Sequence, residues 1–513
     1  MARNALGREL PDTWNGRRVV PYQDPYALRP AGDRATRPLR RVNSGDRKLL
    51  ATLQEAIERA GPRDGMTVST HHHLRNGDDV LNHLVRVLQN IGVRDVTIAS
   101  SSIHPVHAEI IEAIRDGTIT RLECGVNGLI GELASRGELR CPITVRSHGG
   151  RARAIVSGEV PVDVAVIAAP CCDEQGNMNG LLGPSAFGSL GYAFTDALHA
   201  RTVIAVTDHL VPYPAVPVSI PESLVDWVVP VRQLGDPSKI VSTTTRVTTD
   251  PVGLQIARYA AQVIEASGRL RDGFSMQTAS EMPPLPVCIE NVRDLMRRGK
   301  VKGSFGCGGI TGFFVDMLEE GLFRALFDVQ CFDLRAVESM RKNRNHVEIS
   351  ADTYANPFNA GAVVNQLDCV ILGATEVDVD FNVNVNTESN GYLLHNTGGH
   401  SDTAAGAALA IIVAPSVRGR LPIVKDRVTT ITTPGETVDV VVTERGIAVN
   451  ERHPELRAEL LRRKAPVKDI RQLQREIYAV TGTPRALEFD DEVVALIEYR
   501  DGSIIDAVRR IQG

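Results

Sequence analysis

The sequence predicts an α/β protein built from two similar domains that follow one another, with an irregular arm at the N-terminus. Nearly uninterrupted apolar runs, such as 163–169 and 202–206, are typical of parallel strands covered on both faces. Segments with helical apolar spacing alternate with these runs. The 513 residues are too many for one ordinary core, so two domains of roughly 200 to 250 residues are expected.

The first 46 residues form the N-terminal arm. They are rich in Arg, Pro and Gly and show no apolar periodicity. A segment of this composition cannot bury enough apolar surface to form a core, so we expect an irregular structure over residues 1–46. From Lys48 onward, apolar residues recur at helical spacing over 49–57 and 81–91, and the β-branched run at 96–99 predicts a strand.

The second half of the chain repeats a pattern of the first half. Residues 163–179 (DVAVIAAPCCDEQGNMN) align without a gap on residues 368–384 (DCVILGATEVDVDFNVN). The two segments share an Asp before the strand, an Asp after it and a final Asn-x-Asn. Because both copies read as a buried strand followed by an acidic turn, we interpret them as two copies of one α/β domain.

The boundary between the copies is expected near residue 268, where a predicted helix at 252–266 is followed by SGRLRDG. The expected division is therefore an arm at 1–46, a first domain at 47–268 and a second domain at 269–513. The last stretch contains strand-like segments at 438–442 and 493–497 and a helical segment at 455–461. We expect this stretch to complete the second domain.

Composition and charge exclude several classes of function. The formal net charge is −5, and no basic stripe with interleaved aromatic residues occurs, so a nucleic-acid surface is not expected. No signal-peptide pattern begins the chain and no run of about eighteen apolar residues occurs, which predicts a cytoplasmic protein without a membrane span. The eight cysteines lack the spacing of a zinc site, so we expect reduced, structural thiols, including Cys171 and Cys172.

Residues 385–407 (VNTESNGYLLHNTGGHSDTAAGA) hold the main candidates for catalysis. Glu388 lies on a polar turn, and Gly398 and Gly399 precede His400 and the start of a predicted helix. Paired glycines let the backbone approach a ligand, and N–H groups at a helix start favour an oxyanion. A carboxylate beside such donors indicates acyl transfer, so we predict catalytic roles for Glu388, Gly398 and Gly399. A solvated turn is the alternative interpretation of Glu388.

A second glycine-rich segment, GSFGCGGITG at 303–312, is expected to form a similar loop that contains Gly308 and Gly309. Two such loops in one domain favour an oxyanion or pantetheine cradle over simple tight turns. Neither loop matches G-x-G-x-x-G or a Walker sequence, which disfavours nicotinamide and ATP chemistry.

Two polar segments of the first domain are candidates for binding an anionic substrate, STHHHLRNGD at 69–78 and RSHGG at 146–150. Arg75 offers paired N–H donors to a carboxylate, and His72, Ser147 and His148 add further donors. Adjacent histidines cannot all face one ion, so a metal is not expected. Ordinary polar turns above a sheet are the alternative. The predicted substrate-binding set is His72, Arg75, Ser147, His148, Gly149, Gly308, Gly309 and His400.

The segment 385–407 resembles the active-site segment of the CoA-transferase superfamily, in which V-N-x-E-S-x-G leads to G-G-x-x-D and then G-A. Within that superfamily, GGHSDTAAGA, HHHLRNGD and SHGG are most similar to the alpha chains of citrate lyase, and NVNVN, CCDEQGN and VPYP extend the resemblance over nearly the whole chain after the arm. The resemblance implies two tandem CoA-transferase-like α/β domains.

The resemblance also implies a reaction. Chains of this family exchange the acetyl group on an acyl-carrier thioester for citrate, which gives citryl-carrier and acetate. A beta chain then splits the citryl thioester, and a gamma chain carries the CoA-like phosphopantetheine group. The implied protein is therefore an acyl-transferase subunit of an oligomeric citrate lyase, with no dissociable cofactor of its own.

Two other functions stay open at the level of the sequence. A free CoA-transferase or acyl-CoA hydrolase would use Glu388 as a nucleophile, whereas direct attack by citrate would leave Glu388 to orient or screen. A non-catalytic assembly subunit is also possible, because ASEMPP at 279–284 replaces the glycine-rich continuation that the resemblance implies there. The sequence does not choose between citrate and a smaller hydroxy diacid.

Overall fold

The computed structural model describes residues 47–241, 248–278 and 284–512, together with the backbone of four strands near the N-terminus. These strands form two small hairpins, β1 (Ala2–Arg3) with β2 (Glu9–Leu10) and β3 (Thr13–Trp14) with β4 (Arg17–Arg18). The rest of the expected irregular arm, and residues 279–283 of the segment that departs from the resemblance, lie outside the described residues.

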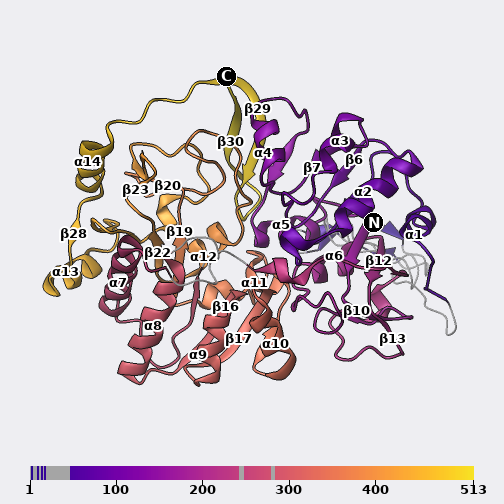
Figure 1. The fold of residues 1–513 in the computed structure, drawn as a ribbon, viewed down its shortest axis with the longest axis horizontal. Coiled ribbons are helices and arrows are strands. Elements are labelled where there is room, and N and C mark those ends of the chain that lie inside the picture. Colours follow the sequence, from indigo (N-terminus) through magenta and orange to yellow (C-terminus); the bar gives the residue numbers. More distant parts are fainter. Residues whose placement is uncertain are drawn as a thin grey trace.

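Two nine-stranded sheets form the framework. In Figure 1 the first lies in the indigo to magenta half on the right, together with the yellow hairpin, and the second lies in the rose to gold half on the left. The first sheet has the order β14-β12-β9-β5-β6-β7-β8-β29-β30, and the second has the order β18-β17-β16-β15-β19-β22-β26-β27-β28. The strands of the first sheet are β5 (Thr67–Ser69), β6 (Val96–Ile98), β7 (Ile119–Leu122), β8 (Ile143–Val145), β9 (Val164–Ala168), β12 (Thr202–Thr207), β14 (Trp227–Pro230), β29 (Phe489–Glu498) and β30 (Ile504–Ile511). Those of the second are β15 (Met276–Thr278), β16 (Gly303–Ile310), β17 (Phe323–Cys331), β18 (His346–Glu348), β19 (Cys369–Gly373), β22 (Ala410–Val413), β26 (Val440–Thr443), β27 (Gly446–Val449) and β28 (Val467–Lys468).

Helices flank both sheets. They are α1 (Leu53–Arg59), α2 (Val80–Ile91), α3 (Ile110–Arg115), α4 (Leu129–Ser135), α5 (His148–Val156), α6 (Ala193–His199), α7 (Pro251–Ala266), α8 (Leu285–Gly299), α9 (Gly312–Glu319), α10 (Leu334–Lys342), α11 (Ala351–Ala355), α12 (His400–Gly406), α13 (Pro454–Arg462) and α14 (Ile470–Thr481). Within the described part of the chain, none of these helices is both long and apolar enough to cross a membrane.

The repeat in the sequence corresponds to a repeat in the fold. The strand order β12-β9-β5-β6-β7-β8 of the first sheet has the same connectivity as β22-β19-β15-β16-β17-β18 of the second. Each half also carries a three-stranded sheet, formed by β11 (Met178–Asn179), β10 (Cys171–Asp173) and β13 (Leu210–Val211) in the first and by β21 (Val383–Asn384), β20 (Glu376–Asp378) and β25 (Val424–Lys425) in the second. These matching orders confirm the expected pair of tandem α/β units.

Equivalent aspartates hold equivalent turns. Asp173 accepts hydrogen bonds from the backbone and side-chain nitrogens of Asn177 at 3.1 and 2.8 Å, and Asp378 accepts the same pair from Asn382 at 2.9 and 3.1 Å. Asp173 with Asn177, and Asp378 with Asn382, are therefore structural residues, since each pair stabilises its own turn.

The sheets divide the chain differently from the expected division at residue 268. Helix α7 packs on α8, β22 and β26 of the second half, and the hairpin β29–β30 extends the first sheet because β29 runs parallel to β8. Figure 1 shows α7 beside α8, and the yellow hairpin beside α4 of the indigo half. The expectation that 493–497 completes the second domain is wrong: an open sheet edge accepts any strand that reaches it, and apolar patterning does not specify which edge.

The expected loop at 303–312 is mainly a strand. Residues Gly303–Ile310 form β16, which pairs with β17 through a bulge between Gly308 and Gly309. The glycines of this strand make room for aromatic side chains, since a Cβ at Gly306 would lie 2.6 Å from the ring of Phe314. Packing therefore explains the glycine content that the sequence indicated as a loop.

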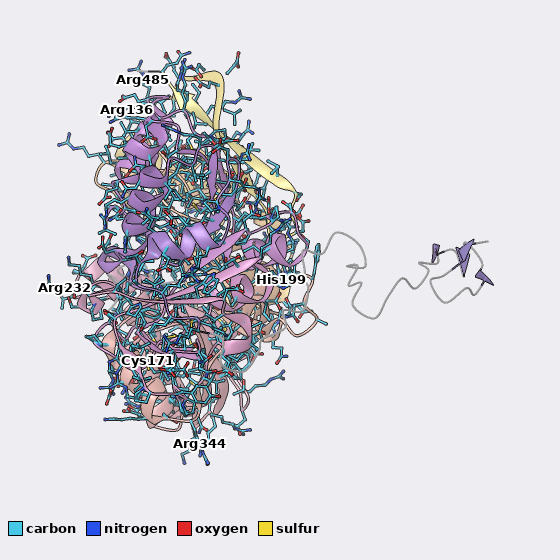
Figure 2. The ribbon with its side chains drawn as sticks, turned by 90° about the vertical axis from the view of Figure 1, so that its right-hand side faces the viewer. Arg136, Cys171, His199, Arg232, Arg344 and Arg485 are labelled. Atoms are coloured by element: carbon cyan, nitrogen blue, oxygen red, sulfur yellow. The ribbon has the colours of Figure 1, made fainter. Side chains whose placement is uncertain are left out.

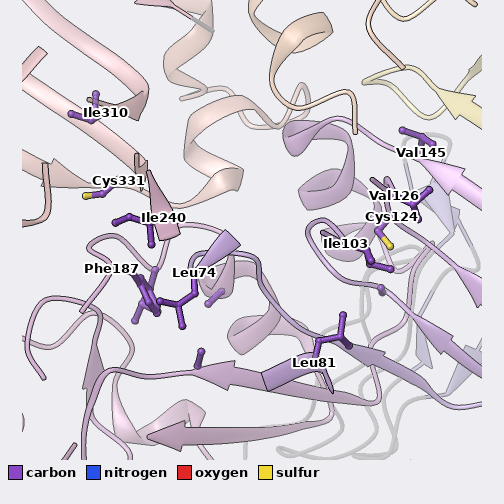
Figure 3. Packing of buried hydrophobic residues seen from close by; sticks show 14 of the residues in the cluster. Leu74, Leu81, Ile103, Cys124, Val126, Val145, Phe187, Ile240, Ile310 and Cys331 are labelled. Atoms are coloured by element: carbon purple, nitrogen blue, oxygen red, sulfur yellow. The ribbon is translucent and has the colours of Figure 1, made fainter. Parts of the chain in front are cut away.

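The two halves share a hydrophobic core. Figure 3 shows Ile310 and Cys331 of the second half near Leu74, Phe187 and Ile240 of the first half, and all five side chains belong to one buried cluster. Figure 2 shows arginines such as Arg136, Arg232, Arg344 and Arg485 at the periphery, whereas Cys171 is buried. All eight cysteines are buried, lie in the described part of the chain and form no disulfide there.

Candidate active site

A cavity of about 390 Å³ lies between the two halves at the carboxyl ends of their parallel strands. The first half lines it with residues that follow β5, β6 and β8, and the second half with residues at the ends of β15, β16, β17 and β19. The carboxyl ends of strands are where α/β proteins bind ligands, and here both copies of the repeat direct them at one space.

Stacked rings form the wall from the first half. The His72 ring stacks on Tyr192 with 4.7 Å between ring centroids, and its Nδ1 lies 2.6 Å from the hydroxyl oxygen of Ser101. His148 Nε2 lies 3.0 Å from the hydroxyl of the same tyrosine. Burial, reinforced by nearby imidazoles, holds the pKa of His72 well below its usual value. His72 is therefore a neutral hydrogen-bonding group at physiological pH.

Two arginines reach the cavity from different halves. Arg75 follows β5 with a φ of 51°, and its guanidinium lies 5.3 Å from the centre of the Phe332 ring. Arg418 belongs to β23 (Val417–Arg418), which pairs with β24 (Leu421–Pro422), and it donates to the carbonyl oxygen of Ala374 at 3.2 Å. Desolvation lowers the pKa of Arg418 although much of its side chain is exposed. An anion between these cations would gain from both.

Gly398 and Gly399 precede α12, and Gly399 lies in a crowded part of the structure, close to the side chain of Tyr354. Gly398 has a left-handed φ of 61°, and a Cβ at Gly399 would lie 2.4 Å from the hydroxyl oxygen of Tyr354. That hydroxyl accepts a hydrogen bond from Gln277 Nε2 at 2.6 Å. Both glycines line the cavity, so the absence of a side chain there leaves the backbone accessible to a ligand.

His400 lines the cavity, but both of its ring nitrogens have partners in the protein. Nε2 donates to the carbonyl oxygen of Gly373 at 2.9 Å, so Nδ1 accepts from the hydroxyl of Thr433 at 2.7 Å. Burial lowers the pKa of His400 to about 4. The neutral imidazole therefore anchors α12 to the end of β19. Because both ring nitrogens are engaged, His400 can contact a substrate only through its ring carbons.

The first residues of α5 and α12 are joined across the two halves. The backbone N–H of His148 donates to the Gly398 carbonyl oxygen at 2.8 Å. Asp402 accepts from the Ser147 hydroxyl at 2.8 Å and from the Gly149 backbone N–H at 2.9 Å. Burial raises the pKa of Asp402 to about 6, and Arg500 opposes the shift. Ser147 and Gly149 therefore belong to this junction and do not line the cavity.

Glu388 is exposed and is not among the residues that line the cavity. It lies on a hairpin turn, where its backbone N–H donates to the carbonyl oxygen of Tyr392 at 2.8 Å and its carboxylate accepts from Asn390 at 3.1 Å.

Gly308 is also outside the lining, since its Cα packs on the Gln277 side chain, while Gly309 lines the cavity. The structure thus assembles His72, Arg75, His148, Gly309, Gly398, Gly399 and His400, but not Glu388.

Several cavity residues were not expected from the sequence. Tyr192, Gln330 and Arg418 come from segments with no recognisable motif, so only the fold brings them to the site. His395 and Asn396 directly precede the Thr-Gly-Gly segment, and their polarity in that position was a usable signal. Asn396 Nδ2 donates to the carbonyl oxygen of Ser101 at 3.0 Å, while its buried Oδ1 has no hydrogen-bond partner among the described residues and can accept from a ligand.

A group with metal-binding side-chain types lies apart from the cavity lining. Asp328, Cys331 and His346 are buried, and one ligand atom of each lies within 4.8 Å of the others. The Asp328 carboxylate already accepts from His346 Nε2 at 2.9 Å and from the Cys331 thiol at 3.1 Å. These contacts make the group a hydrogen-bonded triad.

Comparisons with known proteins agree with this architecture. Residues 46–511 match the family described as citrate lyase, alpha subunit. The chain is 48% identical to the citrate lyase alpha chain of Klebsiella pneumoniae over 467 residues, which cover 91% of this chain and 92% of the relative. It is also 48% identical to the citrate lyase alpha chain of Escherichia coli over 468 residues, which again cover 91% of this chain and 92% of the relative.

Solved structures extend the comparison. A citrate lyase alpha subunit from Streptococcus mutans, crystallised in complex with citrate, has a TM-score of 0.91 and 42% identity, with 100% of both chains covered. A malonate decarboxylase alpha subunit from Acinetobacter baumannii has a TM-score of 0.64 at 16% identity over 86% of this chain and 90% of that chain, which shows a shared fold. The match over nearly the whole chain establishes that this protein belongs to the family of citrate lyase alpha subunits.

Proposed function

We propose that this chain exchanges the acetyl group on an acyl-carrier thioester for citrate, which gives citryl-carrier and acetate. The observation that carries the proposal is the cavity between the halves, which combines two arginines with neutral hydrogen-bonding groups. A cavity of about 390 Å³ has the size of a small-molecule site. The similar Streptococcus mutans structure contains citrate, which supports a tricarboxylate as the acid.

Recognition of the acid is assigned to Arg75 and Arg418, which approach the cavity from opposite halves. A guanidinium binds a carboxylate through paired N–H donors, and two cations that line one cavity favour an acid with several carboxylates over a monoacid. Asn396, whose Oδ1 is open to a donor, fits the hydroxyl of a hydroxy acid. These groups define a hydroxy polycarboxylate as the substrate class.

Acyl transfer proceeds by direct attack in this proposal. One carboxylate of the bound acid attacks the acetyl thioester carbonyl, the C–S bond breaks, and the carrier thiolate leaves, which produces a mixed acetyl-citryl anhydride. The thiolate then attacks the citryl carbonyl of that anhydride, and acetate leaves. Charge develops on carbonyl oxygens in both steps, so donors at His72, at His148 and along the Gly398–Gly399 backbone would lower the barrier.

Glu388 has no covalent role in this scheme. A carboxylate is a useful nucleophile when it is desolvated and held beside the reacting carbonyl. Glu388 is exposed on its turn and outside the cavity lining, so an acyl-glutamate intermediate would require the turn to move.

The proposed partners follow from the substrate. The thioester would be carried by a gamma chain with a CoA-like phosphopantetheine group, and a beta chain would cleave the citryl thioester. We propose that the three chains form an oligomer in the cytoplasm. This chain would supply the acid site and the transfer step, with no cofactor of its own.

The proposal is tested by incubating the purified chain with acetylated carrier and a panel of monocarboxylates, dicarboxylates and tricarboxylates. Acetate release and the mass of the carrier are then measured. Citrate should give citryl-carrier and equimolar acetate. Transfer to free CoA in place of the carrier would favour a free CoA-transferase, and no acyl exchange with the complete set of partner chains would favour an assembly subunit.

A further inference from the structure

The buried carboxylate of Asp402 joins the two halves beside the cavity. Its Oδ1 accepts from the Ser147 hydroxyl at 2.8 Å, and its Oδ2 accepts from the Gly149 backbone N–H at 2.9 Å. His148, which lies between these two partners in the chain, lines the cavity. On its own side, Asp402 lies in the first turn of α12, just after Gly398 and Gly399.

We propose that Asp402 is a positioning residue for the acyl transfer. Its carboxylate holds residues 147–149 of the first half against Gly398 and Gly399 of the second, so that His148 and the two glycines keep one spacing across the cavity. The inference rests on the proposed function, because the spacing matters only if a reacting acyl group lies between these residues.

The hydrogen-bond pattern identifies the ionised form of Asp402 as the one that accepts both hydrogen bonds. Both partners of Asp402 are donors, since the Ser147 oxygen already accepts from the Gly150 backbone N–H at 2.9 Å and directs its own hydrogen toward Asp402. A proton on Asp402 Oδ1 would compete with that hydroxyl hydrogen for the same space. Protonation therefore weakens the hydrogen bonds that align residues 147–149.

The charged and titratable groups around Asp402 come from several elements. The guanidinium of Arg500 lies 3.8 Å from Asp402 Oδ1 and is the cation that opposes the rise in its pKa. The phenols of Tyr192, Tyr354 and Tyr499 also interact electrostatically with the carboxylate. The imidazoles of His148 and His400 lie on α5 and α12. With a pKa of about 6, Asp402 is ionised and accepts both hydrogen bonds above that pH, and it becomes protonated as the pH falls through 6.

The C-terminal hairpin delivers Arg500 to this junction. Arg500 follows β29, which runs parallel to β8, and Glu498 at the end of β29 accepts from Arg146 and from Arg153, both at 2.9 Å. The strand that extends the first sheet thus fixes the position of the cation that faces Asp402. This placement gives the unexpected course of the last strand a role in the site.

The test compares the wild-type chain with Asp402→Asn, Arg500→Gln and a matched control, Asp226→Asn. Asp226 is also buried, and it accepts from the Val203 backbone N–H at 2.7 Å in the first sheet, away from the cavity lining. The value of kcat and the KM for citrate are measured with acetylated carrier from about pH 5 to pH 8.

Wild-type kcat should fall as the pH drops through about 6. Asp402→Asn should lower kcat about tenfold to a hundredfold at neutral pH and change KM less than about threefold. It should also lose the acid limb of the pH profile, which is the fall of kcat below about pH 6. Arg500→Gln should move the limb to higher pH, because the opposing cation is gone. The control should keep both the wild-type kcat and its limb. Ionisation of the acid itself is common to all variants and cancels in the comparison.

Thermal unfolding with and without citrate verifies that each variant folds and binds. If Asp402→Asn does not fold, the Arg500→Gln profile decides, and an unmoved limb would overturn the inference. A folded Asp402→Asn variant with wild-type kcat and limb would overturn it directly. A wild-type chain that exchanges no acyl group would overturn the proposed function as well. An active wild type together with an Asp402→Asn variant of unchanged kcat and pH profile would overturn the positioning role alone.

Discussion

The backbone N–H of His148 donates to the carbonyl oxygen of Gly398 at 2.8 Å, although the two residues belong to different halves of the chain. This bond places the start of α5 beside the start of α12, and each start contributes residues to the cavity wall. The site is therefore a product of the contact between the halves, and neither half contains it alone.

Replacing Glu388 separates the direct and covalent mechanisms. Glu388→Gln keeps the shape of the turn, and direct attack by the acid predicts a loss of acyl transfer within about tenfold. A covalent mechanism would lose nearly all activity, because an amide is a far poorer nucleophile than a carboxylate. Hydroxylamine trapping during turnover, followed by mass analysis of the peptide that contains Glu388, provides the measurement, and a modified Glu388 would contradict direct attack.

A side chain at Gly399 should disable transfer. Gly399→Val should reduce acyl transfer by about a hundredfold or more, as expected when a stabilising donor is displaced. A Cβ at this position would lie 2.4 Å from the Tyr354 hydroxyl, so the start of α12 or the tyrosine has to move. Gly399→Ala combined with Tyr354→Phe should recover part of the activity of Gly399→Ala, because the clashing oxygen is absent. Normal turnover by Gly399→Val would reduce the segment to a structural turn.

The two cavity arginines should control affinity for the acid. Arg75→Gln and Arg418→Gln should each weaken citrate binding about tenfold or more, because each removes a cation from the cavity wall. Calorimetric titration with citrate measures the effect. Arg344→Gln, at an exposed position outside the lining, is the matched control and should bind as the wild type does. Equal affinities in all three variants would place the acid elsewhere.

His400 should make the protein sensitive to acid. Its folded pKa, about 4, is below the ordinary value of 6.5, so the neutral form stabilises the fold above pH 6.5 and this contribution is lost as the pH falls through 4. The change is at most about 3 kcal/mol of unfolding free energy. Chemical denaturation of wild type and His400→Gln near pH 7 and pH 4.5 measures it: the stability advantage of the wild type should shrink at the lower pH. A constant difference would contradict the assignment.

The equivalent aspartates should contribute unequally to stability. Asp173 accepts from the backbone N–H of Ala215 at 2.9 Å, whereas Asp378 accepts the equivalent bond from Val428 at 3.4 Å. Asp173→Ala leaves more buried donors unsatisfied, so it should cost about 3 kcal/mol or more, and Asp378→Ala should cost less. Denaturation midpoints measure both losses, and the reverse order would contradict this account of the two turns.

The polar segments of the site were predictable because local chemistry reveals them. A cation beside three histidines, paired glycines before a helix and a repeated Asp and Asn-x-Asn all indicate functional or turn positions whatever surrounds them. Tyr192 and Arg418 were not predictable in this way, since an isolated tyrosine or arginine in a chain has no local signature. Glu388 shows the converse: a motif that resembles a nucleophile lies on an exposed turn.

The sequence by itself determined the α/β class, the doubling of the unit and the family, because apolar periodicity, turn chemistry and motif order are written along the chain. Only the tertiary structure decided that α7 covers the second sheet, that β29 extends the first, that Gly303–Ile310 is a strand, and that Ser147 and Gly149 bind Asp402 instead of lining the cavity. These outcomes depend on which apolar faces, sheet edges and buried donors find each other across long separations. That choice is made by packing and hydrogen-bond satisfaction in the folded molecule, and local sequence does not encode it.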